Sequence, residues 1–160
     1  MPDILYRKPM SSDLPQLQLL VDEFYQTNAV PELSRRPDIG LSVAQFEKCP
    51  DQGQIVIIES SGTIIGYSIL IFYWSNEYGG NVIVIDEIFV KEQYREQGIP
   101  AHFSSWIEQS FSHSSAGMSM QVSHVNERAA KLYGELGYRS FPCNNLLKVF
   151  GKQISQTDSV

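Results

Sequence analysis

Residues 82–106 place the strongest constraint on how this chain folds. An apolar run of strand length, residues 82–90, contains two adjacent acids, Asp86 and Glu87, and a charged turn then leads through Gly98 into a helix. Apolar side chains on both faces of the run predict a strand that is buried on both sides. Two carboxylates inside such a strand require a β-bulge or a polar cleft. The helix start predicts an anion site, because free N–H groups and the helix dipole attract negative charge there.

The charge balance limits the classes of partner. The 160 residues include 12 basic and 18 acidic side chains, which give a formal net charge of −6. This balance argues against general binding to nucleic acid or to an anionic membrane, and it is compatible with a cationic substrate. Cys49 and Cys143 are the only cysteines, and the sequence has neither an N-terminal signal pattern nor an apolar run of spanning length. We therefore expect a cytoplasmic protein with reduced thiols and no membrane partner.

Length and pattern predict one α/β domain over residues 1–150, followed by a polar tail over residues 151–160. Residues 25–40 contain two prolines and mixed charge without periodicity, so they predict a loop with room for one short helix. The expected helices are a segment from Leu14 to Phe24 capped by Ser11-Ser12-Asp13, a piece near 42–48, one beginning near Gly98 with Pro100 in its first turn, and 126–136. The expected strands are 4–7, 54–60, 63–74, 82–90, 118–123, 138–141 and 146–150.

Two motifs resemble those of a known family. Arg95-x-x-Gly98-x-Pro100 resembles the Q/R-x-x-G-x-G/A signature of the GNAT superfamily of N-acetyltransferases, which lies at the same strand-to-helix turn. Residues 126–138 resemble the family's second segment, N-x-x-A-x-x-x-Y-x-x-x-G-F/Y, and the two motifs occur in the family's order. The closest likeness is to the spermidine/spermine (diamine) and thialysine N-acetyltransferase branch, and it rests on Ile65-Gly66-Tyr67, Phe72-Tyr73-Trp74 and residues 84–90 leading into Tyr94-Arg95.

The resemblance implies an acyl-CoA N-acyltransferase fold, in which helices flank a central mixed sheet with splayed middle strands. It also implies acetyl-CoA as co-substrate and a homodimer, which light scattering would test. No metal is expected, because His102, His113 and His124 lack the spacing of a metal site. The positions that match the family's cofactor-binding segments are Ile88, Phe89, Val90, Arg95, Glu96, Gln97, Gly98, Ile99, Pro100, Ala101, Asn126, Ala129 and Tyr133.

Acetyl transfer from a thioester to an amine needs a neutral nucleophile, a stabilised oxyanion and a proton for the leaving thiolate. An alkylamine with a pKa near 10.4 is almost wholly protonated at neutral pH, so a base or a water relay must accept its proton. Asp86 and Glu87 are the candidate bases, and the choice between them stays open; Asp86 also matches the family's acceptor-binding acid. Both enter the cleft only if a bulge turns them to one side. Tyr133 is the candidate proton donor, and a backbone amide near Ile88 is the candidate oxyanion donor. The resemblance also implies that strand splaying frees the peptides of Phe89 and Val90 to bind the pantetheine arm of the cofactor.

Pro100 departs from the family's pattern, because proline has no N–H to give to a phosphate. Glu96 also adds a negative charge beside the expected phosphates. We expect an acetyl-CoA-dependent N-acetyltransferase that acts on a small primary amine or a polyamine. Two alternatives are a non-catalytic GNAT-like sensor that binds CoA or an amine, and a protein-modifying acetyltransferase, which would present an open groove to its substrate.

Overall fold

The computed structural model describes residues 3–27, 36–122 and 126–141. Its centre is a five-stranded mixed sheet in which the strands follow their order in the chain, β1-β2-β3-β4-β5. The strands β1 to β4 pair antiparallel, and β5 pairs parallel with β4. The strands are β1 (Ile4–Arg7), β2 (Gly53–Ser60), β3 (Thr63–Ser75), β4 (Gly80–Val90) and β5 (Gly117–Met120).

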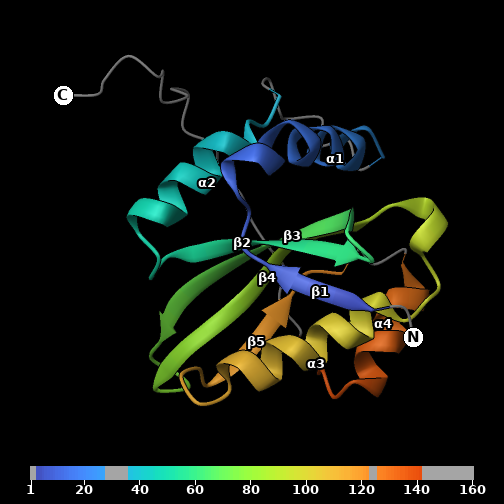
Figure 1. Cartoon of the computed structure of the whole chain (residues 1–160). Coiled ribbons are helices and arrows are strands. Elements are labelled where there is room, and N and C mark those ends of the chain that lie inside the picture. Colours follow the sequence, from blue (N-terminus) through green and yellow to red (C-terminus); the bar gives the residue numbers. More distant parts are fainter. Residues whose placement is uncertain (1–2, 28–35, 123–125, 142–160) are drawn as a thin grey trace.

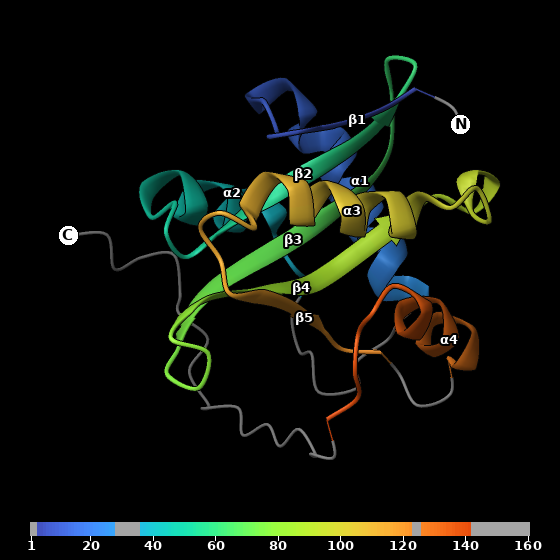
Figure 2. The same cartoon turned by 90° about the horizontal axis from the view of Figure 1, so that it is seen from below.

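Helices cover both faces of this sheet. The helices α1 (Leu14–Thr27) and α2 (Ile39–Lys48) lie on one face, and α3 (Ile99–Phe111) lies across the other (Figures 1 and 2). The last described helix, α4 (Glu127–Glu135), lies beside the beginning of α3 (Figure 2). This arrangement confirms the predicted α/β fold with a central mixed sheet between helices.

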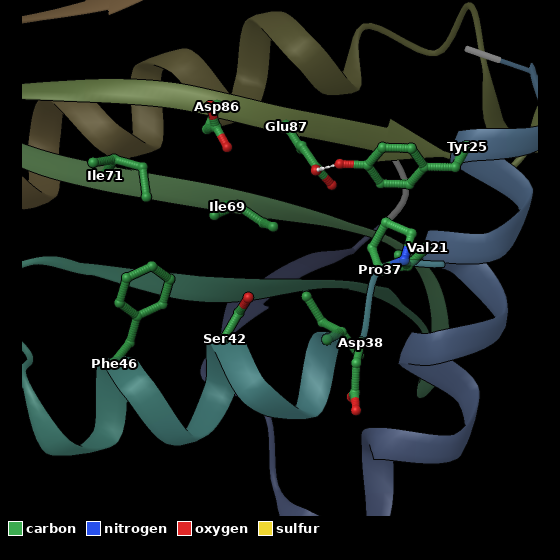
Figure 3. Close-up of a pocket in the computed structure, with 11 residues that line it drawn as sticks. Val21, Tyr25, Pro37, Asp38, Ser42, Phe46, Ile69, Ile71, Asp86 and Glu87 are labelled. Atoms are coloured by element: carbon green, nitrogen blue, oxygen red, sulfur yellow. Dashed lines mark hydrogen bonds between the residues drawn. The ribbon is translucent and has the colours of Figure 1, made fainter. Parts of the chain in front are cut away.

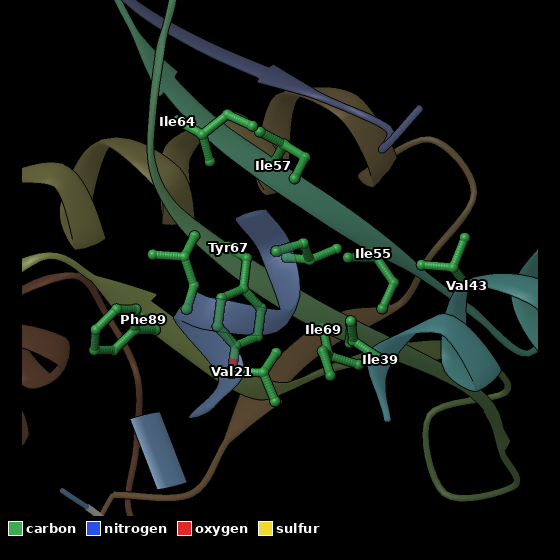
Figure 4. Packing of buried hydrophobic residues seen from close by; sticks show 11 residues of the cluster. Val21, Ile39, Val43, Ile55, Ile57, Ile64, Tyr67, Ile69 and Phe89 are labelled. Carbon is green, nitrogen blue, oxygen red and sulfur yellow. The ribbon is translucent and has the colours of Figure 1, made fainter. Parts of the chain in front are cut away.

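The core beneath α1 and α2 is built from the side chains on one face of the sheet and from one stripe of each helix. Leu17, Leu20 and Val21 supply the stripe of α1 at helical spacing, and each is at most 2% exposed. Figure 4 shows strand side chains of this cluster together with Val21. The other members of this cluster are Ile39, Val43, Ile55, Ile57, Ile64, Tyr67, Ile69 and Phe89.

The core on the opposite face lies beneath α3. Phe103 and Ile107 of α3 pack against Ile83 and Ile85 of β4, and all four are nearly fully buried. Tyr6 of β1 completes this layer by packing its ring against the aromatic side chains of α3. The apolar stripe of α3 is therefore the face that meets the sheet.

Several helices and strands begin or end at residues other than the predicted ones. Residues 25–27 were expected in a loop, but α1 continues through Thr27, because Tyr25 makes a long-range contact described below. The helix α2 begins at Ile39, three residues before the expected start, because Asp38 caps it by accepting a hydrogen bond from the Gly40 N–H. The strand β5 ends at Met120 instead of 123, where its pairing with β4 ends.

Ser11–Asp13 form a 3-10 turn instead of a simple helix cap. The Asp13 carboxylate accepts a hydrogen bond from the Met10 N–H at 2.7 Å and receives the Arg7 guanidinium at 2.6 Å. Arg7 also donates to Glu59, so this turn ties β1 and β2 to the start of α1.

Residues 138–141 were expected as a strand but have no regular structure, because Tyr138 is held through its side chain instead of a strand ladder. The predicted strand 146–150, the tail 151–160 and residues 28–35 of the predicted loop lie outside the described residues. Within the described ranges, no helix has the length and apolarity needed to cross a bilayer.

Candidate active site

The two adjacent acids lie at a β-bulge in β4. Ile85 pairs with Leu70 of β3, and Glu87 pairs with Ile69, so Asp86 is an extra residue in the bulged strand. An extra residue shifts the alternation of side chains by one position. The prediction that two acids within this strand require a bulge or a cleft is confirmed.

The bulge turns both carboxylates toward the same face of the sheet. Ile85 packs beneath α3, whereas Phe89 packs beneath α1, although a regular strand would place these two side chains on one face. The change of phase between them turns Glu87 toward α1 and α2, where Asp86 also lies (Figure 3). The sequence alone left open whether one or both acids enter a cleft. The register between β3 and β4 and the lining of the pocket show that both do.

A pocket of about 180 Å³ lies between the helices α1 and α2 and the strands β3 and β4 (Figure 3). Its walls are mostly apolar, and the acids and Tyr25 are its main polar groups. The lining residues are Val21, Tyr25, Pro37, Asp38, Ile39, Ser42, Phe46, Ile69, Ile71, Asp86 and Glu87. Such a concave site with a few convergent polar groups is typical of a small-molecule site.

Two tyrosines hold the carboxylate of Glu87. The Tyr25 hydroxyl donates a hydrogen bond to Oε1, and the Tyr67 hydroxyl donates to Oε2 at 2.7 Å. Burial raises the pKa of Glu87, and the two phenol hydrogen bonds oppose that rise because they favour the charged form. Burial also raises the pKa of both tyrosines, so they remain protonated donors. Glu87 is therefore an oriented carboxylate that accepts a hydrogen bond at each oxygen.

Asp86 is in a different environment. Its side chain is exposed at the pocket, and within the described part of the chain it forms no hydrogen bond or ion pair. The surrounding protein still removes part of its hydration, which raises its pKa. Asp86 is thus free to bind a cationic group.

The edge of β4 next to the pocket is open. The ladder between β4 and β5 ends at Ile85 and Met120, and among the described residues β4 continues to Val90 with a partner on its β3 side alone. The end of this ladder lies where the resemblance implies that the middle strands splay. It leaves peptide groups of β4 free to bind a ligand.

The register shows which peptides face this open edge. Lys91 N–H donates to the carbonyl of Ile65 at 2.9 Å, so Val90 belongs to a non-hydrogen-bonded pair of the antiparallel ladder and Phe89 to a hydrogen-bonded pair. The peptide groups of Ile88 and Val90 therefore face the open edge, and those of Phe89 face β3. The resemblance implies free peptides at both Phe89 and Val90; the Val90 peptide faces the open edge, whereas that of Phe89 is paired with β3.

Arg95 folds back onto the end of β4. Its Nε donates to the Val90 carbonyl at 2.9 Å, and its guanidinium lies 5.7 Å from the centre of the Phe89 ring. This residue was predicted to contact the cofactor. Its side chain instead supports the strand end, and it engages one of the two free carbonyls.

The predicted phosphate-binding turn has the backbone shape of an anion site. Glu96 and Gly98 adopt the left-handed conformation, with φ of 66° and 72°. The first helical bond of α3 runs from the His102 N–H to the Gly98 carbonyl at 3.0 Å, so the amides of Ile99 and Ala101 precede the ladder. Pro100, between them, is the second residue of the helix and lies in its first turn as expected, and it gives no donor. These residues fit a phosphate group with one donor fewer than the family's motif provides.

Two further predicted cofactor residues of this turn lie on its surface. Glu96 forms a salt bridge with Arg128 at the start of α4. This ion pair offsets the negative charge of Glu96 beside the predicted phosphate site. The side-chain amide of Gln97 donates to the carbonyl of Gln93 at 3.4 Å. The ion pair brings the two sequence motifs together in space.

The second motif forms α4 as predicted. The Asn126 side chain accepts a hydrogen bond from the Ala129 N–H at 3.0 Å and caps the helix. Tyr133 is 6% exposed, and burial, with a smaller effect of Tyr138, raises its pKa to about 12. Its ring packs edge-on against Tyr138. Among the described contacts, none joins Tyr133 to the two acids of β4.

Tyr25 and Tyr67 were not among the predicted functional residues. A signal for Tyr67 was present, because its strand precedes the acidic strand in a hairpin that brings the two side by side. Tyr25 gave no such signal, since the aperiodic sequence after Phe24 predicted a loop. Among the described residues, no group of three or more His, Cys, Asp or Glu side chains is arranged to hold a metal ion.

Known structures share this architecture. A possible acetyltransferase from Clostridium difficile 630 is 17% identical with a TM-score of 0.68, and the match covers 94% of this chain and 98% of that one. The ribosomal-protein-alanine N-acetyltransferase from Brucella melitensis biovar Abortus 2308 is 14% identical, with a TM-score of 0.69 and coverage of 91% and 99%. An aminoglycoside acetyltransferase from an uncultured soil metagenomic sample, solved with sisomicin, is 12% identical, with a TM-score of 0.64 and coverage of 95% and 97%. These low identities establish a shared fold.

No curated protein matches the sequence. A family model does match it, over residues 17–138, and that model describes the acetyltransferase (GNAT) family. The matched range contains the bulged strand, the turn before α3 and the capped helix α4. The chain therefore belongs to the GNAT acetyltransferase family.

Proposed function

We propose that this protein transfers an acetyl group from acetyl-CoA directly to the primary amine of a small molecule, with polyamines included among the candidates. The observation that carries the proposal is the bulge at Asp86. It puts a free carboxylate and an oriented carboxylate on the wall of one pocket, beside the open edge of β4. The pocket volume of about 180 Å³ supports a small acceptor over a protein chain.

Acetyl-CoA, when bound, supplies the acetyl group as a thioester. The residues that would hold it are the peptides of Ile88 and Val90 at the open edge, and the amides of Ile99 and Ala101 at the start of α3. The turn formed by Glu96 and Gly98 gives the backbone concavity that a pyrophosphate needs.

The acids take different parts in this proposal. Asp86 attracts the protonated amine by charge, since nothing else in the described structure pairs with it. Glu87 accepts the proton that the amine must lose, either directly or through a water molecule. Tyr133 is our candidate proton donor to the departing thiolate, because it is the tyrosine of the second motif and its hydroxyl is protonated at neutral pH.

A second candidate function is a non-catalytic sensor of CoA or an amine. Pro100 favours this alternative, because it removes one amide from the predicted phosphate site. The hydrogen bond from Arg95 to the Val90 carbonyl also favours the sensor, because it directs the Arg95 side chain to the end of β4 instead of to a phosphate.

A thiol-release assay with acetyl-CoA and a panel of primary amines tests the two candidates. Turnover that Glu87→Gln lowers by a factor of about 10² to 10⁴ supports the enzyme. Glu47→Gln is the matched control, because Glu47 is an exposed carboxylate on α2 outside the pocket. Absence of turnover together with calorimetric binding of CoA would favour the sensor.

A further inference from the structure

The number of free acids in the pocket limits how many cationic groups it can bind. Three acids line the pocket: Asp38, Asp86 and Glu87. Asp38 accepts a hydrogen bond from the Gly40 N–H at 3.0 Å, and its carboxylate points away from the other two (Figure 3). The oxygens of Glu87 each accept a hydrogen bond from a tyrosine. Of these lining acids, Asp86 alone remains without a partner among the described residues.

The end of the pocket away from Tyr25 is apolar. Phe46 of α2 and Ile71 of β3 lie there on opposite walls, and Ser42 lies about one helical turn before Phe46 on α2 (Figure 3). An ammonium group at this end would lose hydration without meeting a carboxylate, which is unfavourable. An alkyl or aryl group there would instead bury apolar surface, which is favourable.

We propose that the acceptor is a primary monoamine with a short, uncharged apolar tail, whose ammonium group lies at Asp86 and whose tail lies against Phe46 and Ile71. This inference rests on the proposed function and narrows it, because it disfavours diamines and polyamines. The pocket is smaller than the usual range for drug-sized ligands, so the tail is a short chain or a single ring.

The test compares two amines with the same five-carbon chain, n-pentylamine and 1,5-diaminopentane, which differ in that the diamine carries a second ammonium group on its distal carbon. We expect kcat/KM for n-pentylamine to exceed that for 1,5-diaminopentane by about tenfold or more, the equivalent of one unpaired charge at the apolar end. Equal values, or a preference for the diamine, would overturn the proposal.

A designed acid should shift this preference. Ser42→Asp adds a carboxylate to the α2 wall without removing a core side chain, and we expect it to improve the diamine-to-monoamine ratio of kcat/KM about tenfold. Ala44→Asp is the matched control, because it adds the same charge to the exposed side of the same helix and should leave the ratio unchanged. An equal change in both variants would mean that net charge, not the pocket, sets the preference. If Ser42→Asp does not fold, the comparison of the two amines with the wild-type protein still tests the proposal.

Binding separates failure of this inference from failure of the proposed function. Calorimetry of the full chain with each amine, in the absence of acetyl-CoA, needs no turnover. If neither amine is acetylated, the proposed function fails, and tighter binding of n-pentylamine still supports the assignment of the pocket. Equal or tighter binding of 1,5-diaminopentane contradicts that assignment whether or not acetylation occurs.

Discussion

The Tyr25 hydroxyl donates a hydrogen bond to Oε1 of Glu87 and so joins the last turn of α1 to the bulge of β4. Tyr67 supplies the second donor, to Oε2, from the neighbouring strand. Glu87 is consequently fixed in direction, whereas Asp86 beside it is free. Two acids that are adjacent in sequence therefore lie in different environments, and we propose different tasks for them on that basis.

Tyr25→Phe should lower kcat by about tenfold and move the acidic limb of the kcat/KM profile to higher pH. Burial raises the pKa of Glu87, and the phenol hydrogen bond opposes this rise. Loss of the hydroxyl therefore raises that pKa further, so that Glu87 becomes protonated at a higher pH and the base is lost earlier as pH falls. Steady-state rates across the acidic range measure both effects.

The groups that share this environment with Glu87 are Tyr25 of α1, Tyr67 of β3 and Asp86 of β4. Tyr78→Phe is the control, because Tyr78 is an exposed tyrosine in the connection between β3 and β4. If Tyr25→Phe and Tyr78→Phe both give the wild-type pH profile, Tyr25 does not tune the base.

Asp86→Asn should raise KM for the amine by about ten- to hundredfold with a smaller change in kcat. The reason is that a hydrogen bond to a charged group contributes about 1.5–3 kcal/mol, and the amide keeps the shape but not the charge. Initial rates at varied amine concentration separate the two constants. A fall in kcat with an unchanged KM would instead assign proton transfer to Asp86 and amine binding to Glu87.

Local sequence patterns predicted much of this molecule, and contacts between distant segments produced the rest. The strand, turn and helix of residues 82–106 follow from the periodicity of the sequence. The two adjacent acids in a buried strand predicted a bulge or a polar cleft. The parity of the peptides after the bulge could not be read from the sequence, because it depends on which residue of β4 is the extra one. For that reason Ile88 and Val90, and not Phe89, face the open edge.

The Tyr25–Glu87 contact joins residues 62 positions apart, which explains why the last turn of α1 was predicted as a loop. The salt bridge between Glu96 and Arg128 is likewise non-local, and it changes Glu96 from an isolated charge beside the predicted phosphate site into half of an ion pair. The start of α2 is different, since Asp38 is a recognisable cap in the sequence.

Gly66→Ala should destabilise the sheet beside the site. A β-carbon at this position would lie 2.2 Å from the Phe89 carbonyl oxygen, so β3 and β4 would have to separate. Overpacking of this kind costs about 1–3 kcal/mol, which corresponds to a fall in Tm of several degrees, measured by thermal unfolding. Gly117→Ala in β5 is the control, because an added β-carbon there meets no atom within 4 Å. Equal Tm values for the two variants would contradict the close approach at Gly66.

Pro100→Ala should tighten CoA binding by about fivefold or more. The substitution supplies an N–H between the amides of Ile99 and Ala101, in the first turn of α3, where a hydrogen bond to a charged phosphate adds more than 1 kcal/mol. Loss of the preset proline φ opposes the gain by less than that amount. Calorimetric titration with CoA measures the net effect, and Pro50→Ala, at an exposed proline after α2, controls for the general effect of removing a proline. Tighter binding in Pro100→Ala alone would mean that the natural chain gives up cofactor affinity at this turn. Unchanged binding would mean that the amide of residue 100 does not face the phosphate, and the sensor alternative would lose its main support.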